Sequence, residues 1–168
     1  MMIESIIENI KSLFSDIKIN IADDKRIKIF IHKEVVISVL SFLKNSGYNH
    51  LGLISCVDWM DENEFELIYI LSSYSDDSEM GETMFLVKTR LPREKAEFYT
   101  VMNIFENAEP YERELHELYG LNFKGHPRLI PLLLERKYDT PPFRKDFDTR
   151  KYVKDFFDKI PSIEVKKE

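Results

Sequence analysis

Residues 17–31 read IKINIADDKRIKIFI, and this stretch decides how the first half of the chain folds. Isoleucines occupy alternate positions on both sides of an Asp-Asp pair. Alternation with a period of two is typical of a strand with one buried face, and two such runs around a polar turn predict a β-hairpin. We therefore expect a sheet that starts here and a core on its isoleucine face.

Amphipathic helices are predicted on both sides of this hairpin. Before it, apolar residues fall at helical spacing along residues 3–14, with charged residues between them. After it, the same spacing runs through residues 35–43 and stops before Gly47, which lies where a helix takes a left-handed final residue. The second helix is expected to cover the hairpin.

Three more strands are predicted at about 50–59, 65–74 and 83–91. The turns between them are short and polar, which fits antiparallel connections. Pro92 ends this run of strands.

Helical character returns in residues 94–105 and again in residues 110–119, where Pro110 stands at the first helical position and Gly120 follows the last. The predicted fold class is α+β, with a mixed or antiparallel sheet and helices packed on one face.

The remainder of the chain lacks a regular period, although it is rich in leucine, proline, aromatic and basic residues. Its apolar side chains are too numerous to be left in water, which argues against simple disorder. We therefore divide the chain into an α+β body, residues 1–120, and an extended, irregular C-terminal arm, residues 121–168. The arm is expected to bury its apolar side chains on a partner protein.

Charge is distributed unevenly between these two parts. The net charge is −6, but residues 1–120 hold 12 Lys/Arg against 22 Asp/Glu, or −10, whereas residues 121–168 hold 12 against 8, or +4. A basic arm can seek nucleic acid, anionic lipid or an acidic protein surface. There is no dense Lys/Arg block and the acidic body would repel phosphates, so nucleic acid is not an expected partner.

Composition excludes several kinds of site. Cys56 is the only cysteine, so this chain alone can hold neither a disulfide nor a thiolate zinc or iron–sulfur site. The five glycines form no dinucleotide or phosphate-loop motif, and no serine lies in a nucleophile elbow. No apolar run reaches the roughly 18 residues of a membrane span, and the N-terminus does not resemble a secretion signal, so we expect a cytoplasmic protein.

One helix carries residues that suit a metal site. Glu112 and His116 lie one turn apart, and His126 follows nearby. No fourth ligand is evident, so hydrogen bonding and salt bridging are the favoured interpretation. Arg113 and Glu117 are likewise interpreted as a solvated ion pair. A small enzyme that works at this helix is the least favoured function.

An ordered series of motifs resembles a known family. It comprises a Glu-Arg-Glu triplet, a helix-ending glycine, a Gly-His-Pro element, a leucine run and a closing Pro-Phe-Arg-Lys-Asp-Phe motif, at residues 112–114, 120, 125–127, 132–134 and 142–147. With Val57-Asp58-Trp59 upstream, the series is similar to the 30-kilodalton subunit family of respiratory complex I, also known as its C subunit, and to the related subunit of energy-converting membrane-bound nickel–iron hydrogenases. The similarity covers roughly residues 20 to 150.

Departures from the pattern bear on which branch this chain resembles. Ile130 and Pro131 stand where complex I members commonly carry two arginines, and residues 138–141 replace a Trp-Gly-His element. The His116-Glu117 pair and the leucine run look more like the hydrogenase branch.

The resemblance implies a non-catalytic peripheral subunit of a membrane-associated multisubunit oxidoreductase, of the NADH:quinone oxidoreductase or energy-converting hydrogenase type. It implies no cofactor on this chain, with iron–sulfur, nickel–iron or quinone sites on partner subunits. The implied partners are a large hydrogenase-like or quinone-site subunit and a small iron–sulfur subunit. Attachment to the cytoplasmic membrane would occur only through the complex.

No catalytic, cofactor-binding or metal residue is therefore expected, and the candidate site is an interface with a partner. Its expected residues are Glu112, Arg113, Glu114, His116, Phe123, Gly125, His126, Pro127, Phe143, Arg144, Lys145 and Asp146. The alternative is a free-standing adaptor or binding module of the same fold, outside any electron-transfer complex.

Overall fold

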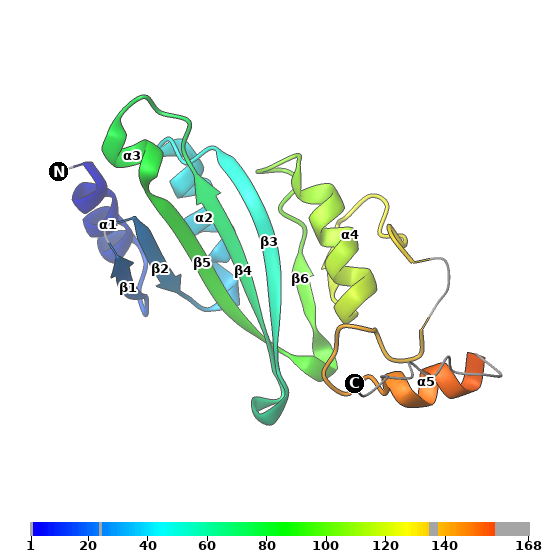
Figure 1. Cartoon of the computed structure of the whole chain (residues 1–168). Coiled ribbons are helices and arrows are strands. Elements are labelled where there is room, and N and C mark those ends of the chain that lie inside the picture. Colours follow the sequence, from blue (N-terminus) through cyan, green and yellow to red (C-terminus); the bar gives the residue numbers. More distant parts are fainter. Residues whose placement is uncertain (1, 24, 135–137, 157–168) are drawn as a thin grey trace, which may run out of the picture.

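A five-stranded mixed sheet forms the centre of the molecule (Figure 1). The computed structural model describes residues 2–23, 25–134 and 138–156. The strands follow the spatial order β1-β2-β5-β4-β3, with the bounds β1 Lys18–Asp23, β2 Arg26–Phe30, β3 His50–Trp59, β4 Glu64–Ser72 and β5 Met84–Pro92. Neighbours are antiparallel except β2 and β5, which run parallel. The predicted hairpin and the three further strands are confirmed.

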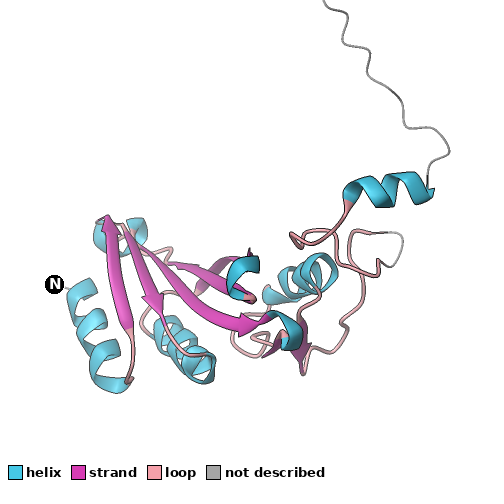
Figure 2. Cartoon of the chain, turned by 90° about the horizontal axis from the view of Figure 1, so that it is seen from below, coloured by secondary structure: helices cyan, strands magenta, loops and turns pink. Residues whose placement is uncertain are grey.

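Two helices lie on one face of this sheet, α1 (Met2–Leu13) and α2 (Val36–Asn45) (Figure 2). Phe14, the residue after α1, meets Phe42 of α2 edge to face, with ring centroids 6.4 Å apart. Gly47 follows α2 with a φ of +99°, the left-handed conformation predicted for it. The predicted α+β class, with helices on one face of a mixed sheet, is confirmed.

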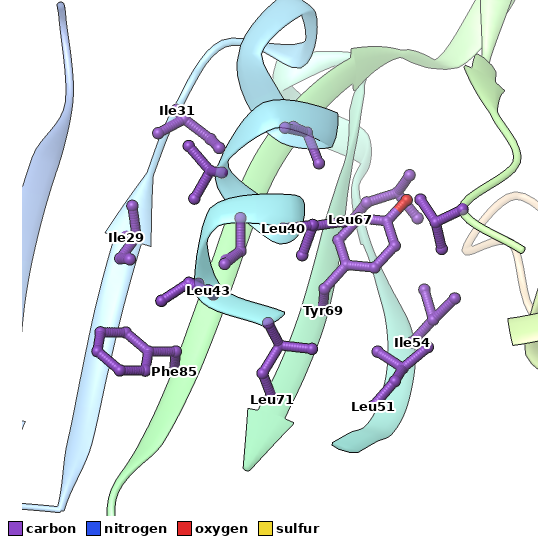
Figure 3. Packing of buried hydrophobic residues seen from close by; sticks show 14 of the residues in the cluster. Ile29, Ile31, Leu40, Leu43, Leu51, Ile54, Leu67, Tyr69, Leu71 and Phe85 are labelled. Atoms are coloured by element: carbon purple, nitrogen blue, oxygen red, sulfur yellow. The ribbon is translucent and has the colours of Figure 1, made fainter. Parts of the chain in front are cut away.

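The core lies between α2 and the sheet (Figure 3). Leu40 and Leu43 of α2 face side chains of alternate residues on three strands, among them Ile29, Tyr69 and Phe85, and all five are fully buried. Burying one such side chain contributes about 1.5–3 kcal/mol, so the alternation in the sequence specifies which face of each strand points inward. Cys56 belongs to this core, and burial raises the pKa of its thiol to about 12, as expected for a structural cysteine.

The opposite face of the sheet carries an ion-pair network. The Glu66 carboxylate is almost closed to solvent and lies 2.8 Å from Lys88 Nζ and 3.2 Å from Arg90 Nε. The Arg90 guanidinium also stacks over Trp59, 4.7 Å from the ring centroid. Ion pairs and a cation–π contact thus stabilise the side chains on this face of the sheet, which α1 and α2 do not cover.

Residues 94–105 do not form the predicted helix. They contain a 3-10 turn, η3 (Arg93–Lys95), and the short strand β6 (Glu97–Tyr99), followed by turns. Phe98, Val101 and Phe105 are all buried. Their i, i+3, i+7 spacing imitates a helix, but it arises from a strand and a tight turn that point into one core, so the prediction was wrong.

The remaining elements connect and extend these layers. They are η1 (Lys33–Val35), η2 (Met60–Glu62), α3 (Ser78–Glu82), α4 (Ala108–Tyr119), β7 (Asn122–Lys124) and α5 (Thr149–Phe156). The short helix α3 lies in the polar connection between β4 and β5. No helix in the described ranges is both long enough and apolar enough to span a lipid bilayer.

Helix α4 lies beside β3, at the side of the sheet away from β1 (Figure 1). It begins two residues before Pro110, and Gly120 ends it with a φ of +79°, as predicted. The Tyr111 hydroxyl donates to the carbonyl oxygen of Gly52 (2.9 Å), and Asn107 Nδ2 donates to that of Leu51 (2.7 Å). These bonds fix the start of α4 against the edge of the sheet.

The first residues after Gly120 pack with the body. Strand β7 pairs in parallel with β6, and Leu121 and Phe123 lie in the core. Residues 129–134 and 141–147 both bond to α4, and α5 follows the second of these segments (Figure 1). The last part of the predicted arm, residues 157–168, lies outside the described residues.

Candidate functional site

Two side chains of α4 hold a loop of the arm, residues 129–134. Arg113 Nε donates to the carbonyl oxygen of Ile130 (3.0 Å), and Arg113 Nη2 donates to that of Pro131 (2.9 Å). The Glu117 carboxylate accepts the main-chain N–H groups of three successive residues, at 3.1, 2.8 and 2.7 Å, from Leu132, Leu133 and Leu134. We call residues 129–134 the leucine loop. Charge-assisted bonds from both sides fix its backbone.

These contacts correct the predicted pairing on α4. Arg113 Nη1 forms its i,i+4 ion pair with Glu109 (3.0 Å), while Glu117 faces the leucine loop. Burial would raise the pKa of Glu117, but the N–H donors of Leu133, Leu134 and Leu132 outweigh it and lower that pKa. The carboxylate is thus held in its charged form.

The arm closes onto the body through a second set of charges at residues 141–147. Arg93 Nη2 lies 2.9 Å from Asp146 Oδ1. The same guanidinium pairs with Asp58, and Asp58 Oδ2 accepts the main-chain N–H of Lys145 at 2.8 Å. The main-chain N–H of Phe143 donates to the carbonyl oxygen of Leu118 at 3.0 Å. Residues 141–147, which we name the closing segment, therefore bind back onto α4 and the sheet of the same chain.

Aromatic rings lie beneath this closure. The guanidinium groups of Arg93 and Arg144 each lie 5.5 Å from the centroid of the buried Phe65 ring. Tyr119 contacts Phe65 on one side and Phe143 on the other, at 6.0 and 5.9 Å between ring centroids. Stacking of guanidinium groups on aromatic faces stabilises the site independently of the ion pairs.

Glu112 is a residue of α4, and its side chain is fully buried. Its Oε1 accepts the main-chain N–H of Val101 and its Oε2 accepts the Thr100 hydroxyl, both at 2.7 Å. Burial raises the pKa of this carboxyl, and the two hydrogen bonds reduce the rise. Glu112 therefore fixes the turn between β6 and α4, and its side chain presents no surface to a partner in this conformation.

His116 does not pair with Glu112. Its Nδ1 lies 2.7 Å from the carbonyl oxygen of Leu121. Glu114, on the same helix, is half-buried. His126 lies after the bend at Gly125, where its Nδ1 accepts the main-chain N–H of Arg128 (3.1 Å). In the described ranges, no group of three or more His, Cys, Asp or Glu side chains is placed to hold a metal ion.

The predicted interface residues are thus distributed over four environments. Glu112 and Phe123 are buried. Arg113 and His116 face the arm, and the closing segment brings Arg144, Lys145 and Asp146 to the end of the sheet, while Gly125 and Pro127 lie exposed at the bend. Their contact with a partner remains a prediction.

Sequence reasoning missed Asp58, Arg93 and Glu117 as site residues. Val57-Asp58-Trp59 was a visible signal, because an acidic residue between apolar neighbours of a strand points to a charged partner. Arg93 and Glu117 had no comparable signal.

Comparison with known proteins gives consistent matches. Residues 29–153 match the family model described as respiratory-chain NADH dehydrogenase, 30 Kd subunit. The C subunit of the F(420)H(2) dehydrogenase of Methanosarcina mazei is 37% identical over 125 residues, which is 73% of this chain and 76% of that protein. The C/D subunit of the NADH-quinone oxidoreductase of Blochmanniella pennsylvanica is 28% identical over 132 residues, 73% of this chain but only 21% of that protein.

Two solved structures are also similar. A chain of the membrane-bound sulfane sulfur reductase, described as an archaeal respiratory membrane complex, superposes with a TM-score of 0.83 at 29% identity, over 95% of this chain and 94% of that chain. A trypsin-resistant fragment (1-134) of Nqo5 superposes with a TM-score of 0.65 at 24% identity, over 77% of this chain and all of the fragment, which shows a shared fold.

Proposed function

Since the chain belongs to the family of the 30-kilodalton subunit of the respiratory-chain NADH dehydrogenase, we propose that it is a non-catalytic peripheral subunit that scaffolds the large subunit of a membrane-associated oxidoreductase. Its relatives include subunits of complex I and of F(420)H(2) dehydrogenase, and a chain of a respiratory membrane complex. The scaffolding role is the part that we add.

One observation carries this proposal: the arm is tied to the body by charged groups yet keeps large apolar side chains exposed. Ile130, Leu132, Leu133 and Phe143 all expose more than a third of their surface. Clustered exposed apolar side chains of this size mark interaction sites more often than chance positions. In the residues that the structure describes, this surface has no arrangement of catalytic groups, but its apolar face is held in a fixed position. Such a surface suits a scaffold.

The names of two relatives support a D-type large subunit as the neighbour. In the C/D proteins, one polypeptide carries both designations, and this chain matches about a fifth of its length, 21%. A covalent link keeps two parts at high effective concentration, which is useful when they bind each other. The small iron–sulfur subunit is proposed as a second neighbour.

Redox groups belong on the partners in this proposal. Iron–sulfur clusters, and a nickel–iron or quinone site, would lie on the partner subunits, and the chain would meet the cytoplasmic side of the membrane only through the complex. None of the relatives named above is a hydrogenase, so a hydrogenase assignment rests only on the His116-Glu117 pair and the leucine run.

The test is co-expression of the tagged chain with the D-type large subunit of its own organism, followed by co-purification and calorimetric titration. We expect a stoichiometric complex. The chain purified alone without oxygen should contain no stoichiometric iron, nickel or flavin by metal analysis and visible absorption. A folded large subunit that does not bind the chain, or a stoichiometric redox group on the chain itself, would refute the scaffold function.

A further inference from the structure

The leucine loop is a rigid apolar projection. Five hydrogen bonds from Arg113 and Glu117 fix its main chain, so its carbonyl and N–H groups turn toward α4. Three of its aliphatic side chains face solvent instead: Ile130, Leu132 and Leu133 are 41%, 38% and 63% exposed.

Such rigidity matters for binding. A loop that is already ordered loses little conformational entropy when a partner covers it, and this increases the affinity obtained from the same apolar area. Three exposed aliphatic residues on a mobile loop would be an aggregation liability, whereas on a fixed loop they form an anchor of the kind found at the centre of interfaces.

A hollow lies beside the loop, against α4. Its volume is about 370 Å³, and its walls include His116, Leu129, Pro131, Leu134, Tyr138 and Pro141. The walls are mainly apolar, with few polar groups, as in sites that accept a bulky side chain.

His116 supplies a directed polar group in this wall. A carbonyl oxygen only accepts hydrogen bonds, so Nδ1, 2.7 Å from the carbonyl oxygen of Leu121, must carry the proton. In the tautomer with its proton on Nδ1, Nε2 is an acceptor, and no hydrogen bond from a described residue reaches it. As a wall residue, His116 thus offers Nε2 as one acceptor to a visiting group.

From these features we infer that the leucine loop and the adjoining hollow form the docking site for the D-type large subunit, which inserts a bulky apolar side chain bearing a hydrogen-bond donor. The inference rests on the proposed function and specifies where that partner binds. The arm, with 12 Lys/Arg against 8 Asp/Glu, further predicts an acidic rim around the partner's apolar surface.

The first test compares two leucines of equal exposure. Leu133 in the loop is 63% exposed and Leu13 at the end of α1 is 62% exposed, so glutamine at either position disturbs the fold equally little. Titration of the large subunit should show that Leu133→Gln weakens binding about tenfold or more, the effect of losing an anchor residue. Leu13→Gln should bind like the wild type.

A second test separates the two nitrogens of His116. Asparagine can still donate to the carbonyl oxygen of Leu121 but lacks a group at the Nε2 position. His116→Asn should therefore keep the melting temperature of the isolated chain and weaken binding of the large subunit several-fold. A photo-crosslinking residue at position 133 should couple to the large subunit, and one at position 13 should not.

The possible outcomes distinguish the two proposals. If the wild-type chain does not bind the large subunit, the proposed function fails. If the wild type binds and Leu133→Gln binds with the same affinity, or position 133 does not crosslink, the scaffold function stands and the docking site is refuted.

Discussion

Arg93 and Asp58 form an ion pair that is almost closed to solvent, with Nε and Oδ1 2.9 Å apart and side chains only 8% and 2% exposed. This pair joins η3, which follows β5 directly, to β3. It also receives the closing segment, through the main-chain N–H of Lys145 and the carboxylate of Asp146. The pair therefore serves both the sheet and the arm. A buried charge left without its partner is far more costly than an exposed one.

The two acids that share Arg93 should respond very differently to the same substitution. Asp58→Asn removes the buried charge beside the guanidinium, leaves only the partly exposed Asp146 as its partner, and should lower the free energy of unfolding by about 3–5 kcal/mol. Asp146 is 43% exposed, so Asp146→Asn should cost less than about 1 kcal/mol. Urea unfolding of both variants measures the difference, and equal losses would contradict the assigned burial.

Amide exchange should reveal the closing segment in the isolated chain. The N–H groups of Phe143 and Lys145 are donated to Leu118 and Asp58, so both should exchange slowly. Asp58→Asn should accelerate exchange at both positions and leave the leucine loop protected, because the loop is held by α4 instead. Fast exchange at Phe143 and Lys145 in the wild-type monomer would show that the segment does not close in solution.

The sequence predicted those parts of the fold whose signal is local. Alternating isoleucines specified the hairpin and the buried face of β2, although Ile21 of β1 is exposed. Gly120 marked the end of α4. Both signals depend on the periodicity or conformation of neighbouring residues. The helix predicted for residues 94–105 was wrong because the structure there depends on a distant segment. Strand β6 forms by pairing with β7, more than twenty positions along the chain. Helical spacing of buried residues there could not reveal that pairing.

The candidate site was less predictable because its contacts join distant residues. Lys145 and Asp58 are separated by 87 positions, and Arg93 and Asp146 by 53. On α4, local spacing suggested Arg113 with Glu117, yet the hydrogen bonds of Glu117 go to three N–H donors of the leucine loop. Motif order located the right region and tertiary contacts determined what each side chain does.

The leucine loop should loosen in acid as Glu117 becomes protonated. The pKa of Glu117 in the folded protein lies below its ordinary value of 4.5. The stabilisation that ionised Glu117 gives to the loop is therefore complete above pH 4.5 and is lost as the pH falls through the lower folded pKa. Amide chemical shifts of Leu132, Leu133 and Leu134 should therefore titrate together with a midpoint below 4.5. Glu117→Gln should abolish this common transition. A midpoint at or above 4.5 would contradict the three donated hydrogen bonds.

Substitution of Arg113 tests whether this residue fixes the leucine loop or stabilises the α+β body. Arg113→Ala removes two hydrogen bonds to the carbonyl groups of Ile130 and Pro131 and the ion pair with Glu109, and all three lie outside the hydrophobic core. The melting temperature of the chain should change little, whereas affinity for the large subunit should fall because the loop is no longer fixed. Retained affinity would show that Glu117 alone orders the loop. Loss of affinity together with unfolding would instead place Arg113 among the residues that hold the body.

Glu112 should prove structural, although it stands in the motif that suggested an interface. Glu112→Ala orphans the buried N–H of Val101, at about 1–3 kcal/mol, and adds a cavity. Glutamine can accept from Val101 and donate to the Thr100 hydroxyl, so Glu112→Gln should remain close to wild-type stability.

The stabilities of the wild type and of Glu112→Gln should depend differently on pH. A raised folded pKa means that ionised Glu112 destabilises the fold, and stability falls as pH rises from 4.5 through that raised value. Glu112→Gln removes this decline, since it carries no proton to lose, and should still bind the large subunit with wild-type affinity because the side chain is buried. Urea unfolding at several pH values and calorimetric titration decide the matter. If Glu112→Gln folds normally but loses the partner, the carboxylate is an interface residue and its burial does not persist in the complex.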